Sequence, residues 1–298
     1  MGSLFGGKMA LIGHQVTMVD VSPAVIEAIN TNGLILDDEK GRHVIELKAG
    51  RAEDFPEAAD LVILFTKTMY SLEALRGAAG LIGPATYVLS LQNGLGNIEM
   101  ISQFTLLNRI LIGVTNMPGD LLKPGHTASR GPGFTKIMSA DGVMNPMVET
   151  LARELEKAGL GGQVYPDILV AIWEKAGFNA AINSTTAVCR TNCGSMNLTE
   201  EGRRLAFNIA REAAAVANAH GVKASAQSII DSLKNTFDVH RDHFTSMAQD
   251  IVNQRPTEVA SINGEICAKA RQAGLETPCT ETLYALIRTI EASYPARN

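Results

Sequence analysis

The first half of the chain alternates short apolar runs with amphipathic stretches. Three apolar runs are bounded by polar residues and glycines, as in strands buried on both faces, at 60–67, 86–94 and 109–117. Two further runs, at 33–38 and 43–48, flank Lys40-Gly41 and predict a pair of strands around a turn. This alternation predicts an α/β fold with a mostly parallel sheet and helices on its faces.

Helical periodicity takes over near Tyr165-Pro166 and continues toward the C-terminus. Two of the predicted helices, at 201–221 and 257–274, are long and end on a glycine suited to a left-handed cap. At 298 residues the chain exceeds the usual size of one hydrophobic core. We therefore predict two domains, an α/β domain at 1–165 and an all-helical domain at 166–298.

Composition narrows the class of protein. Acids and bases are mixed along the chain, the net charge is -5, and no basic block is present that would follow a nucleic-acid backbone or an anionic membrane. No apolar run reaches the roughly 18 residues that span a bilayer, and no secretory signal begins the sequence. The four cysteines form no paired ligand motif, so we expect reduced thiols and no metal site. These features predict a cytoplasmic protein whose partner is neither nucleic acid nor membrane.

The first twenty residues fit the second half of a dinucleotide-binding motif. A glycine- and alanine-rich helix pattern at 4–12 is followed by an apolar run at 16–19 that ends on Asp20. Gly2 fits the third glycine of a G-x-G-x-x-G phosphate turn, and Asp20 is placed to accept hydrogen bonds from an adenosine ribose. The same pattern occurs in α/β proteins that bind no nucleotide, so both interpretations stay open.

The first strand and the two earlier glycines of that motif would lie upstream of Met1. Our hypothesis is that the sequence starts at an internal methionine or is a shortened form of a longer protein. After the run that ends on Asp20, Ser22-Pro23 predicts a helix start, with the Ser22 hydroxyl as its N-cap.

Polar residues gather at the ends of two predicted strands and along one predicted helix. Lys67 and Asn93 stand at the ends of two apolar runs, so they lie at the carboxyl edge of the sheet, where ligands of this fold class bind. Lys175, Asn179 and Asn183 are spaced four apart, so a helix places them in one polar stripe. That stripe suits a small molecule with a carboxylate, a carbonyl and a hydroxyl. The competing interpretation is a solvated helix face.

Several segments together carry a family resemblance: FTK at 65–67, LQNGLGN at 91–97, WEKAGFNAAINSTTA at 173–187, TSMAQD at 245–250 and TEVASING at 257–264. In this order and spacing they resemble the ketopantoate reductase (2-dehydropantoate 2-reductase) family across nearly the whole chain. The resemblance implies a Rossmann-type dinucleotide-binding domain, an all-helical substrate-binding domain and a cleft between them. It also implies reduction of ketopantoate to pantoate by hydride transfer from NAD(P)H, on the route to pantothenate and coenzyme A.

The same resemblance implies roles for individual residues. By similarity Lys175 is the catalytic lysine, whose ammonium stabilises the developing oxyanion and donates a proton, while Asn179 and Asn183 bind the substrate. Glu258 resembles the acidic partner of that lysine, and its alternative is an ordinary first-turn glutamate favoured by the helix dipole. Ser246 resembles the serine that contacts the substrate carboxylate, and its alternative is a plain helix cap.

Lys67 and Asn93 are implied cofactor contacts, with Asn93 also near the reacting centre and bound to substrate. The alternative at Asn93-Gly94 is a simple turn. Family members that prefer NADPH often carry a basic residue after the second strand, whereas this chain has Asp20 and then Val21. An aspartate repels the 2'-phosphate and suits the ribose diol, so we expect NADH to be preferred, although Lys67 can still serve a phosphate.

Two other functions stay open. NAD-dependent D-2-hydroxyacid dehydrogenases, which share this scaffold, act on other branched or aromatic 2-keto acids, and Asp20 favours that alternative. A folded protein that binds no cofactor and catalyses nothing is the second alternative, because part of the phosphate turn is absent from the sequence. The family contains dimers as well as monomers, so a homodimer also stays open.

Overall fold

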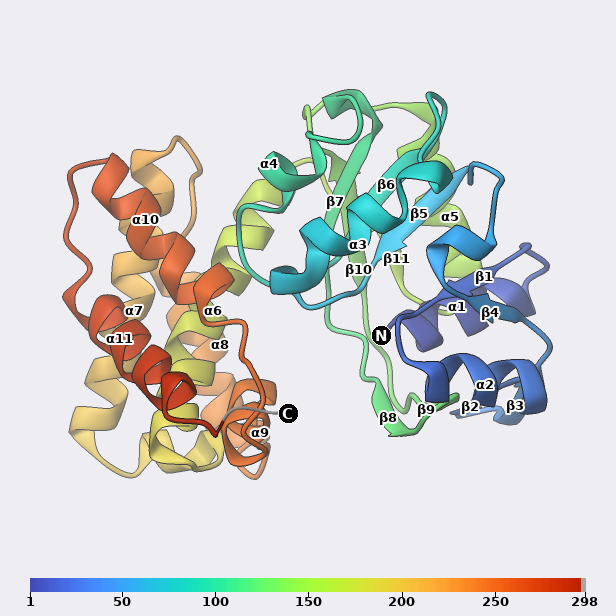
Figure 1. Ribbon diagram of the computed structural model, residues 1–298. Coiled ribbons are helices and arrows are strands. Elements are labelled where there is room, and N and C mark those ends of the chain that lie inside the picture. Colours follow the sequence, from blue (N-terminus) through green and yellow to red (C-terminus); the bar gives the residue numbers. More distant parts are fainter. Residues whose placement is uncertain (296–298) are drawn as a thin grey trace. The chain divides into compact units, whose positions relative to one another are not determined.

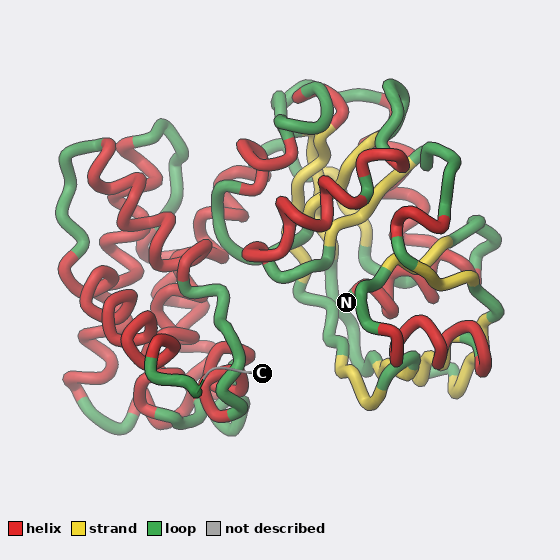
Figure 2. The backbone as a smooth tube through the Cα atoms, viewed as in Figure 1, coloured by secondary structure: helices red, strands yellow, loops and turns green. Residues whose placement is uncertain are grey.

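A computed structural model describes residues 1–295, which divide into two compact units. The first unit contains Met1–Thr66, Tyr70–Gln92 and Asn97–Ile168, and the second contains Lys67–Met69, Asn93–Gly96 and the chain from Leu169 onward. All described strands belong to the first unit (Figure 1 and Figure 2). Two short loops that follow strands of the first unit therefore make their contacts within the second unit.

The main sheet of the first unit has five strands in the order β11-β10-β7-β6-β5. Its strands are β5 (Leu61–Leu64), β6 (Tyr87–Ser90), β7 (Ile110–Thr115), β10 (Thr135–Ser139) and β11 (Gly162–Val164). The pairs β5-β6, β6-β7 and β10-β11 are parallel, and β10 runs antiparallel to β7. Each residue of β7 is buried, as the apolar run predicts for a central strand.

Smaller sheets complete the strands of this unit. Strand β1 (Thr17–Val19) pairs in parallel with β4 (Lys48–Gly50), and a second sheet has the order β3-β2-β9-β8. The latter contains β2 (Leu34–Asp38), β3 (Gly41–Ile45), β8 (Asp120–Lys123) and β9 (His126–Ala128). The predicted pairing around Lys40-Gly41 is confirmed, because β2 and β3 run antiparallel on either side of it.

This part of the described chain also contains five α-helices and four short 3-10 turns, of which the turn at Thr68–Tyr70 has its first two residues in the second unit. The helices are α1 (Gly2–Leu11), α2 (Pro23–Asn32), α3 (Ser71–Gly77), α4 (Asn97–Ile101) and α5 (Pro146–Lys157). Helix α5 packs on β10 and β11, while α1 and α2 pack on β2. The 3-10 turns are Ala52–Asp54, Thr68–Tyr70, Ala79–Leu81 and Leu107–Arg109.

Two glycines allow α1 to approach its strands closely. A Cβ atom at Gly6 would lie 2.6 Å from Met18 Sδ, and one at Gly7 would lie 3.1 Å from Leu34 Cδ2. At Gly2 the corresponding atom would meet Phe65 Cβ at an ordinary 3.8 Å. Close helix packing therefore requires small residues in the middle of α1 rather than at its start.

The second unit is helical, with α6 (Ile168–Cys189) surrounded by shorter helices. These are α7 (Glu200–Ala219), α8 (Ala226–Val239), α9 (Ser246–Val252), α10 (Glu265–Gln272) and α11 (Pro278–Ala292), with a 3-10 turn at Cys193–Asn197. The left-handed glycines predicted after two of these helices are confirmed, because Gly221 has φ +78° and Gly274 has φ +68°. No helix of the described residues is long and apolar enough to cross a membrane.

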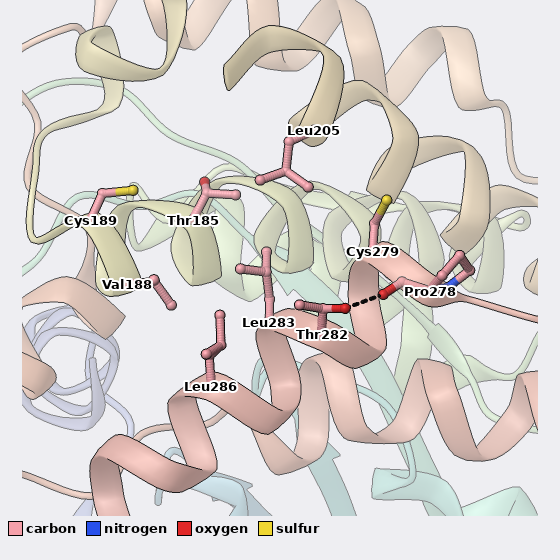
Figure 3. Close-up of a pocket in the computed structure, with 9 residues that line it drawn as sticks. All are labelled: Thr185, Val188, Cys189, Leu205, Pro278, Cys279, Thr282, Leu283 and Leu286. Carbon is pink, nitrogen blue, oxygen red and sulfur yellow. Dashed lines mark hydrogen bonds between the residues drawn. The ribbon is translucent and has the colours of Figure 1, made fainter. Parts of the chain in front are cut away.

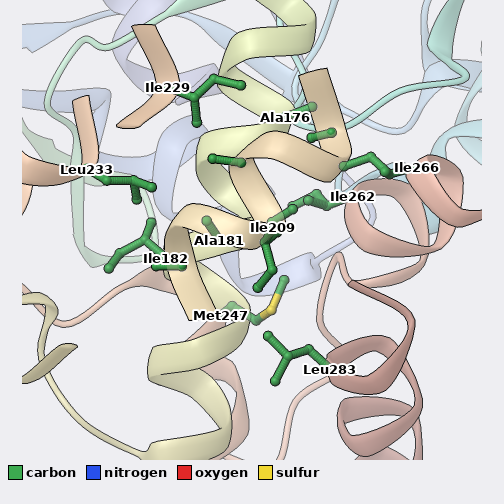
Figure 4. Close-up of a cluster of buried hydrophobic side chains, with 14 of the residues drawn as sticks. Ala176, Ala181, Ile182, Ile209, Ile229, Leu233, Met247, Ile262, Ile266 and Leu283 are labelled. Atoms are coloured by element: carbon green, nitrogen blue, oxygen red, sulfur yellow. The ribbon is translucent and has the colours of Figure 1, made fainter. Parts of the chain in front are cut away.

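Alanines on α6 form much of the core of this unit. Ala176, Ala180 and Ala181 are almost fully buried, and branched side chains from the other helices pack on them (Figure 4). Every residue of α6 from Asn179 to Ala187 is buried. Small side chains let several helices approach one central helix, which encloses the polar residues of that stretch as well.

The helix predicted at 257–274 differs in its first part. A π turn, η6 (Ala260–Gly264), precedes α10, and Gly264 N–H binds the carbonyl of Val259 five residues earlier, at 2.9 Å. The carbonyl of Ser261 inside this turn accepts the N–H of Leu95 at 2.9 Å. The π turn thus makes a tertiary contact with a loop that is distant in sequence. Local periodicity predicts an ordinary helix here, because it carries no information about such a contact.

Candidate active site

The polar stripe lies on α6 and is not a solvated helix face. Asn179 is 7% exposed and Asn183 is 8% exposed, and Lys175, one turn earlier, is half-buried. Within the described part of the chain, no group hydrogen-bonds the side-chain amide of either asparagine. A buried amide ordinarily has a partner, so these two are available to a ligand that brings complementary groups.

The environment of Lys175 disfavours the charged form of its amino group. Burial lowers the pKa of Lys175 to about 8, and the negative charge of Glu258 opposes that shift. The side chain is therefore mostly protonated at neutral pH, yet it can release its proton more readily than an exposed lysine. That combination suits a general acid.

Glu258 lies two residues before the π turn, and its carboxylate faces the strand-end loops. Its Oε2 accepts the Nδ2–H of Asn93 at 3.2 Å, and its Oε1 accepts the N–H of Thr68 at a long 3.5 Å. The half-buried carboxylate thus makes tertiary contacts. The carbonyl of Glu258 accepts the N–H of Ile262 at 3.1 Å, so the residue also begins the turn, and the alternative of an ordinary first-turn glutamate stays open.

The loop at Asn93–Gly96 is a turn that also reaches the candidate site. Gly94 has φ +87°, and a Cβ atom there would lie 2.4 Å from the carbonyl oxygen of Ser261. The carbonyl of Asn93 accepts the Thr68 hydroxyl at 3.1 Å. Glycine is therefore required both by the backbone conformation and by the close approach to η6. Thr68 is a contact that the sequence analysis missed, although it directly follows the predicted Lys67.

A buried asparagine joins η6 to the lysine-bearing helix. Asn263 is fully buried, and its Nδ2 donates to the carbonyl of Ala180 on α6 at 3.3 Å. The π turn after Glu258 is thereby fixed on the helix that carries Lys175. Asn263 lies within the TEVASING segment, but its role could not be predicted from the sequence, because its partner Ala180 is 83 residues away.

Lys67 is engaged in an ion pair. Its Nζ lies 2.6 Å from Asp250 Oδ2 on α9 and donates to the carbonyl of Pro256 at 2.9 Å. Arg255 Nε binds the other oxygen of Asp250 at 3.0 Å. The predicted cofactor contact of Lys67 stays a prediction, and the structure adds Asp250 as the partner that the sequence analysis missed.

Ser246 is the first residue of α9, but it is not its cap. Thr245 occupies the N-cap, its hydroxyl accepts the N–H of Ala248 at 3.3 Å, and it shares a hydrogen bond with Thr186 of α6 at 2.8 Å. The helix-cap alternative for Ser246 is therefore wrong. Its side chain is exposed, and its predicted contact with a substrate carboxylate stays a prediction.

Asp20 and Gly2 belong to the first unit. Asp20 follows β1 and is half-buried, and its Oδ1 accepts the N–H of Ser22 at 2.8 Å. The prediction that the Ser22 hydroxyl caps α2 is wrong, because that hydroxyl makes no capping bond and the Asp20 carboxylate binds the Ser22 N–H instead. Val21 beside it is 76% exposed, and no described side chain caps the first turn of α1.

An apolar hollow of 460 Å³ lies on the second unit (Figure 3), and its lining includes none of Lys175, Asn179 and Asn183. Its walls come mainly from aliphatic side chains and two thiols, including Val188, Leu205, Leu283, Leu286, Cys189 and Cys279. The hydroxyl of Thr282 in this hollow already donates to the carbonyl of Pro278 at 2.7 Å. None of its described lining residues is charged, so it offers nothing to a substrate carboxylate.

Comparison with known proteins decides the family. Residues 1–142 match "Ketopantoate reductase PanE/ApbA", and residues 167–291 match "Ketopantoate reductase PanE/ApbA C terminal". The chain belongs to the ketopantoate reductase family. The 2-dehydropantoate 2-reductase of Streptococcus pyogenes serotype M18 is 32% identical over 98% of this chain and 95% of its own length. That of Pyrococcus horikoshii is 33% identical over the same shares.

A solved structure of the same fold extends this comparison. D-mandelate dehydrogenase with NADH and anilino(oxo)acetate is 28% identical, covers 98% of this chain and 96% of its own, and superimposes with a TM-score of 0.92. The predicted fold class, a Rossmann-type α/β part followed by a helical part, is confirmed. As a member of the ketopantoate reductase family, the chain is an oxidoreductase.

Proposed function

We propose that this protein reduces 2-dehydropantoate to pantoate with NAD(P)H. The observation that carries the proposal is Lys175, whose pKa burial lowers to about 8, on the same helix as the buried Asn179 and Asn183 amides. The family to which the chain belongs supports the choice of substrate. We assign the dinucleotide to the predicted domain at 1–165 and the keto acid to the domain at 166–298.

Lys175 is the proposed proton donor. When bound, the reduced nicotinamide supplies a hydride to the carbonyl carbon of the keto acid. Negative charge then grows on the carbonyl oxygen, where the Lys175 ammonium stabilises it and transfers one proton from Nζ to give the alcohol. Lys175 is left neutral and regains a proton from solvent. Glu258 favours the protonated form throughout, because its carboxylate opposes the effect of burial on the lysine.

The amide groups of α6 are the proposed substrate contacts. Each asparagine amide offers two donors and one acceptor, which match the carboxylate, the keto oxygen and the hydroxyl of 2-dehydropantoate. We assign Asn179 and Asn183 to these groups, Ser246 to the substrate carboxylate, and Asn93 to a position near the reacting centre. Asn93 also holds Glu258 through its Nδ2.

The residues present fit a nicotinamide dinucleotide. The first turn of α1, which begins at Gly2, carries no acidic residue and no capping side chain among the described residues, so its N–H groups suit a phosphate. Asp20 keeps its Oδ2 for a ribose hydroxyl, since Oδ1 is the oxygen that binds Ser22. Lys67, which we assign to the cofactor, is already paired with Asp250. We therefore propose NADH rather than NADPH as the preferred donor.

A second function has support of its own. D-mandelate dehydrogenase superimposes with a TM-score of 0.92, and Asp20 suits NADH, the dinucleotide bound in that related structure. A D-2-hydroxyacid dehydrogenase for aromatic or branched 2-keto acids would use the same lysine and the same proton transfer. Substrate preference separates the two functions.

The test is the loss of absorbance at 340 nm with either NADH or NADPH and a panel of keto acids. Ketopantoate, benzoylformate and 2-oxoisovalerate are compared by kcat/KM. We expect ketopantoate to give the highest value, and NADH to exceed NADPH. A higher value for benzoylformate would replace the proposal by the dehydrogenase, and cofactor binding without turnover of any keto acid would refute both.

A further inference from the structure

The carboxylate of Glu291, near the end of α11, binds the residue next to Glu258. Its Oε1 accepts both the N–H and the hydroxyl of Thr257, each at 2.7 Å. The Thr257 hydroxyl in turn accepts the N–H of Val259 at 3.2 Å. Thr257 and Val259 are both buried, so the residues on either side of Glu258 are fixed by one chain of hydrogen bonds.

A second contact holds the same segment one residue earlier. Lys67 Nζ donates to the carbonyl of Pro256 at 2.9 Å and is itself paired with Asp250. Lys67 and Glu291 therefore hold two consecutive residues, Pro256 and Thr257, directly before Glu258. Its own carboxylate accepts hydrogen bonds from the side chain of Asn93 and, at longer range, from the N–H of Thr68. The position of that carboxylate therefore also depends on the backbone on either side.

We propose that Glu291 is a positioning residue of the active site: by binding Thr257 it fixes the carboxylate of Glu258 at the place from which that carboxylate stabilises the charged form of Lys175. The importance of Glu291 to the reaction rests on the proposed function, whereas its hydrogen bonds to Thr257 do not. Carboxylate acceptors make shorter and stronger hydrogen bonds than neutral ones, which suits a fixed anchor.

Charged groups face this arrangement from several elements. The charge of Glu258 acts on Lys175, and burial together with that charge sets the pKa of the lysine at about 8. Near Pro256, the charged groups are Lys67 and Arg255, which both pair with Asp250. On α11 itself, Arg288 Nη1 lies 3.5 Å from Glu291 Oε2, the oxygen that does not bind Thr257. The Thr257 bonds and the Arg288 pair therefore use different oxygens of the same carboxylate.

Loss of this anchor has a defined electrostatic consequence. In Glu291→Ala the Thr257 N–H and hydroxyl lose their acceptor, and Glu258 is free to move away from Lys175. Burial would then lower the pKa of Lys175 with less opposition, so its titration shifts to lower pH. In Glu291→Gln the amide oxygen still accepts both bonds, and the position of Glu258 is kept. Both variants remove the charge of Glu291, but only Glu291→Ala removes the anchor of Thr257. The comparison therefore separates the effect of the position of Glu258 from the effect of the charge of Glu291.

The test is the pH dependence of Lys175 acylation by acetic anhydride, read by mass spectrometry of the peptide that contains it. The variants are Glu291→Ala, Glu291→Gln and Glu258→Gln, with Glu281→Ala as the control. Glu281 lies on the same helix in an exposed pair with Arg271. This measurement needs no substrate, so it stands even if the protein reduces no keto acid.

We expect the titration midpoint of Lys175 to fall by about half a pH unit or more in Glu291→Ala and in Glu258→Gln. Glu291→Gln and Glu281→Ala should keep the wild-type midpoint. An unshifted midpoint in Glu291→Ala, with Glu258→Gln shifted, would overturn the proposal. So would equal shifts in Glu291→Gln and Glu291→Ala, because the charge of Glu291 and not the position of Glu258 would then matter.

Folding and catalysis are checked separately. If Glu291→Ala fails to fold, Glu291→Leu replaces it, because leucine fills the space of the glutamate side chain but offers no acceptor to either Thr257 donor. We expect a shift in the same direction for Glu291→Leu, and its absence would overturn the proposal. Where ketopantoate is reduced, Glu291→Ala should lower kcat by on the order of tenfold with little change in KM. A raised KM with an unchanged kcat would contradict the positioning role.

Discussion

Asn93 and Glu258 are separated by 165 residues in the sequence, yet Nδ2 of Asn93 donates to Oε2 of Glu258 at 3.2 Å. The loop that follows β6 is thereby joined to the segment that precedes η6. Leu95, two residues later, adds its N–H bond to Ser261. The loop and the π turn thus form one contact, in which an amide and a carboxylate meet near the lysine-bearing helix.

A substitution at Gly94 tests whether the loop must lie this close to the carbonyl of Ser261. Gly94→Ala places a methyl group 2.4 Å from the Ser261 carbonyl at a positive φ, so the loop must move and Asn93 with it. We expect Gly94→Ala to lose about 2 kcal/mol more stability than Gly142→Ala, together with most of kcat. Gly142 is the matched control, since it has φ +74° and open space around its Cβ position. Thermal unfolding and initial rates measure both effects, and equal behaviour of the two variants would contradict the fit.

The amides of α6 should affect substrate binding rather than folding. Asn179→Ala and Asn183→Ala remove amides that no described group hydrogen-bonds, so the free energy of unfolding should change by less than about 1 kcal/mol. We expect KM for ketopantoate to rise about tenfold in each. Ser184→Ala is the control on the same helix, because its hydroxyl already donates to the carbonyl of Ala180. It should lower stability and leave KM unchanged, and a reversal of this pattern would exclude the substrate role.

Asp20 should set the preference between the two nicotinamide cofactors. Replacement by serine removes a negative charge that repels the 2'-phosphate of NADPH. We expect Asp20→Ser to raise the ratio of kcat/KM for NADPH to that for NADH by about tenfold. Asp120→Ser, an exposed change on β8, serves as the control and should leave the ratio unchanged. An unaltered ratio in Asp20→Ser would rule out the ribose contact.

Two neighbouring aspartates should make the first unit sensitive to acid. Hydrogen bonds from Arg42 and His126 hold the pKa of Asp37 far below its usual range. Burial raises the pKa of Asp38, but hydrogen bonds from Lys8, the Lys40 N–H and His43 outweigh it and lower that pKa to about 2. Because both folded-state values are depressed, their stabilisation is present above the unfolded pKa of 3.8 and is lost as the pH falls toward 2.

Asp38→Asn provides the measurement. We expect the variant to unfold at a lower temperature than the wild type at neutral pH, and the difference to shrink between about pH 4 and about pH 2. Asp141→Asn is a useful comparison, since bonds from Ser139 and Val143 lower the pKa of Asp141 without a cationic partner. A difference between wild type and Asp38→Asn that persists at about pH 2 would contradict the assignment of the effect to ionised Asp38.

Much of the fold could be predicted from local pattern. The buried strands β5, β6 and β7 and the β2-β3 pair follow from runs of apolar residues and one glycine turn. The stripe of Lys175, Asn179 and Asn183 follows from the four-residue spacing of a helix. These features depend on residues near one another in the sequence, which is why periodicity can reveal them.

The anchors of Glu258 could not be predicted in the same way. Glu291 binds Thr257 across 34 residues, and Lys67 binds Asp250 across 183 residues. An acidic residue near the end of an amphipathic helix has many possible partners, and nothing in its local pattern selects one. The π turn η6 was missed for a related reason, because its carbonyl at Ser261 binds a loop from elsewhere in the chain.

The most direct test of the account is the pH profile of kcat/KM for ketopantoate, followed through the oxidation of NADH at 340 nm. The reaction requires protonated Lys175, whose pKa is about 8. We therefore expect kcat/KM to be constant near neutral pH and to fall above about pH 8 in the wild type, with Lys175→Met slower by on the order of a thousandfold. A profile that stays flat well above that pH, or a Lys175→Met variant that keeps its rate, would contradict the assignment of Lys175 as the proton donor.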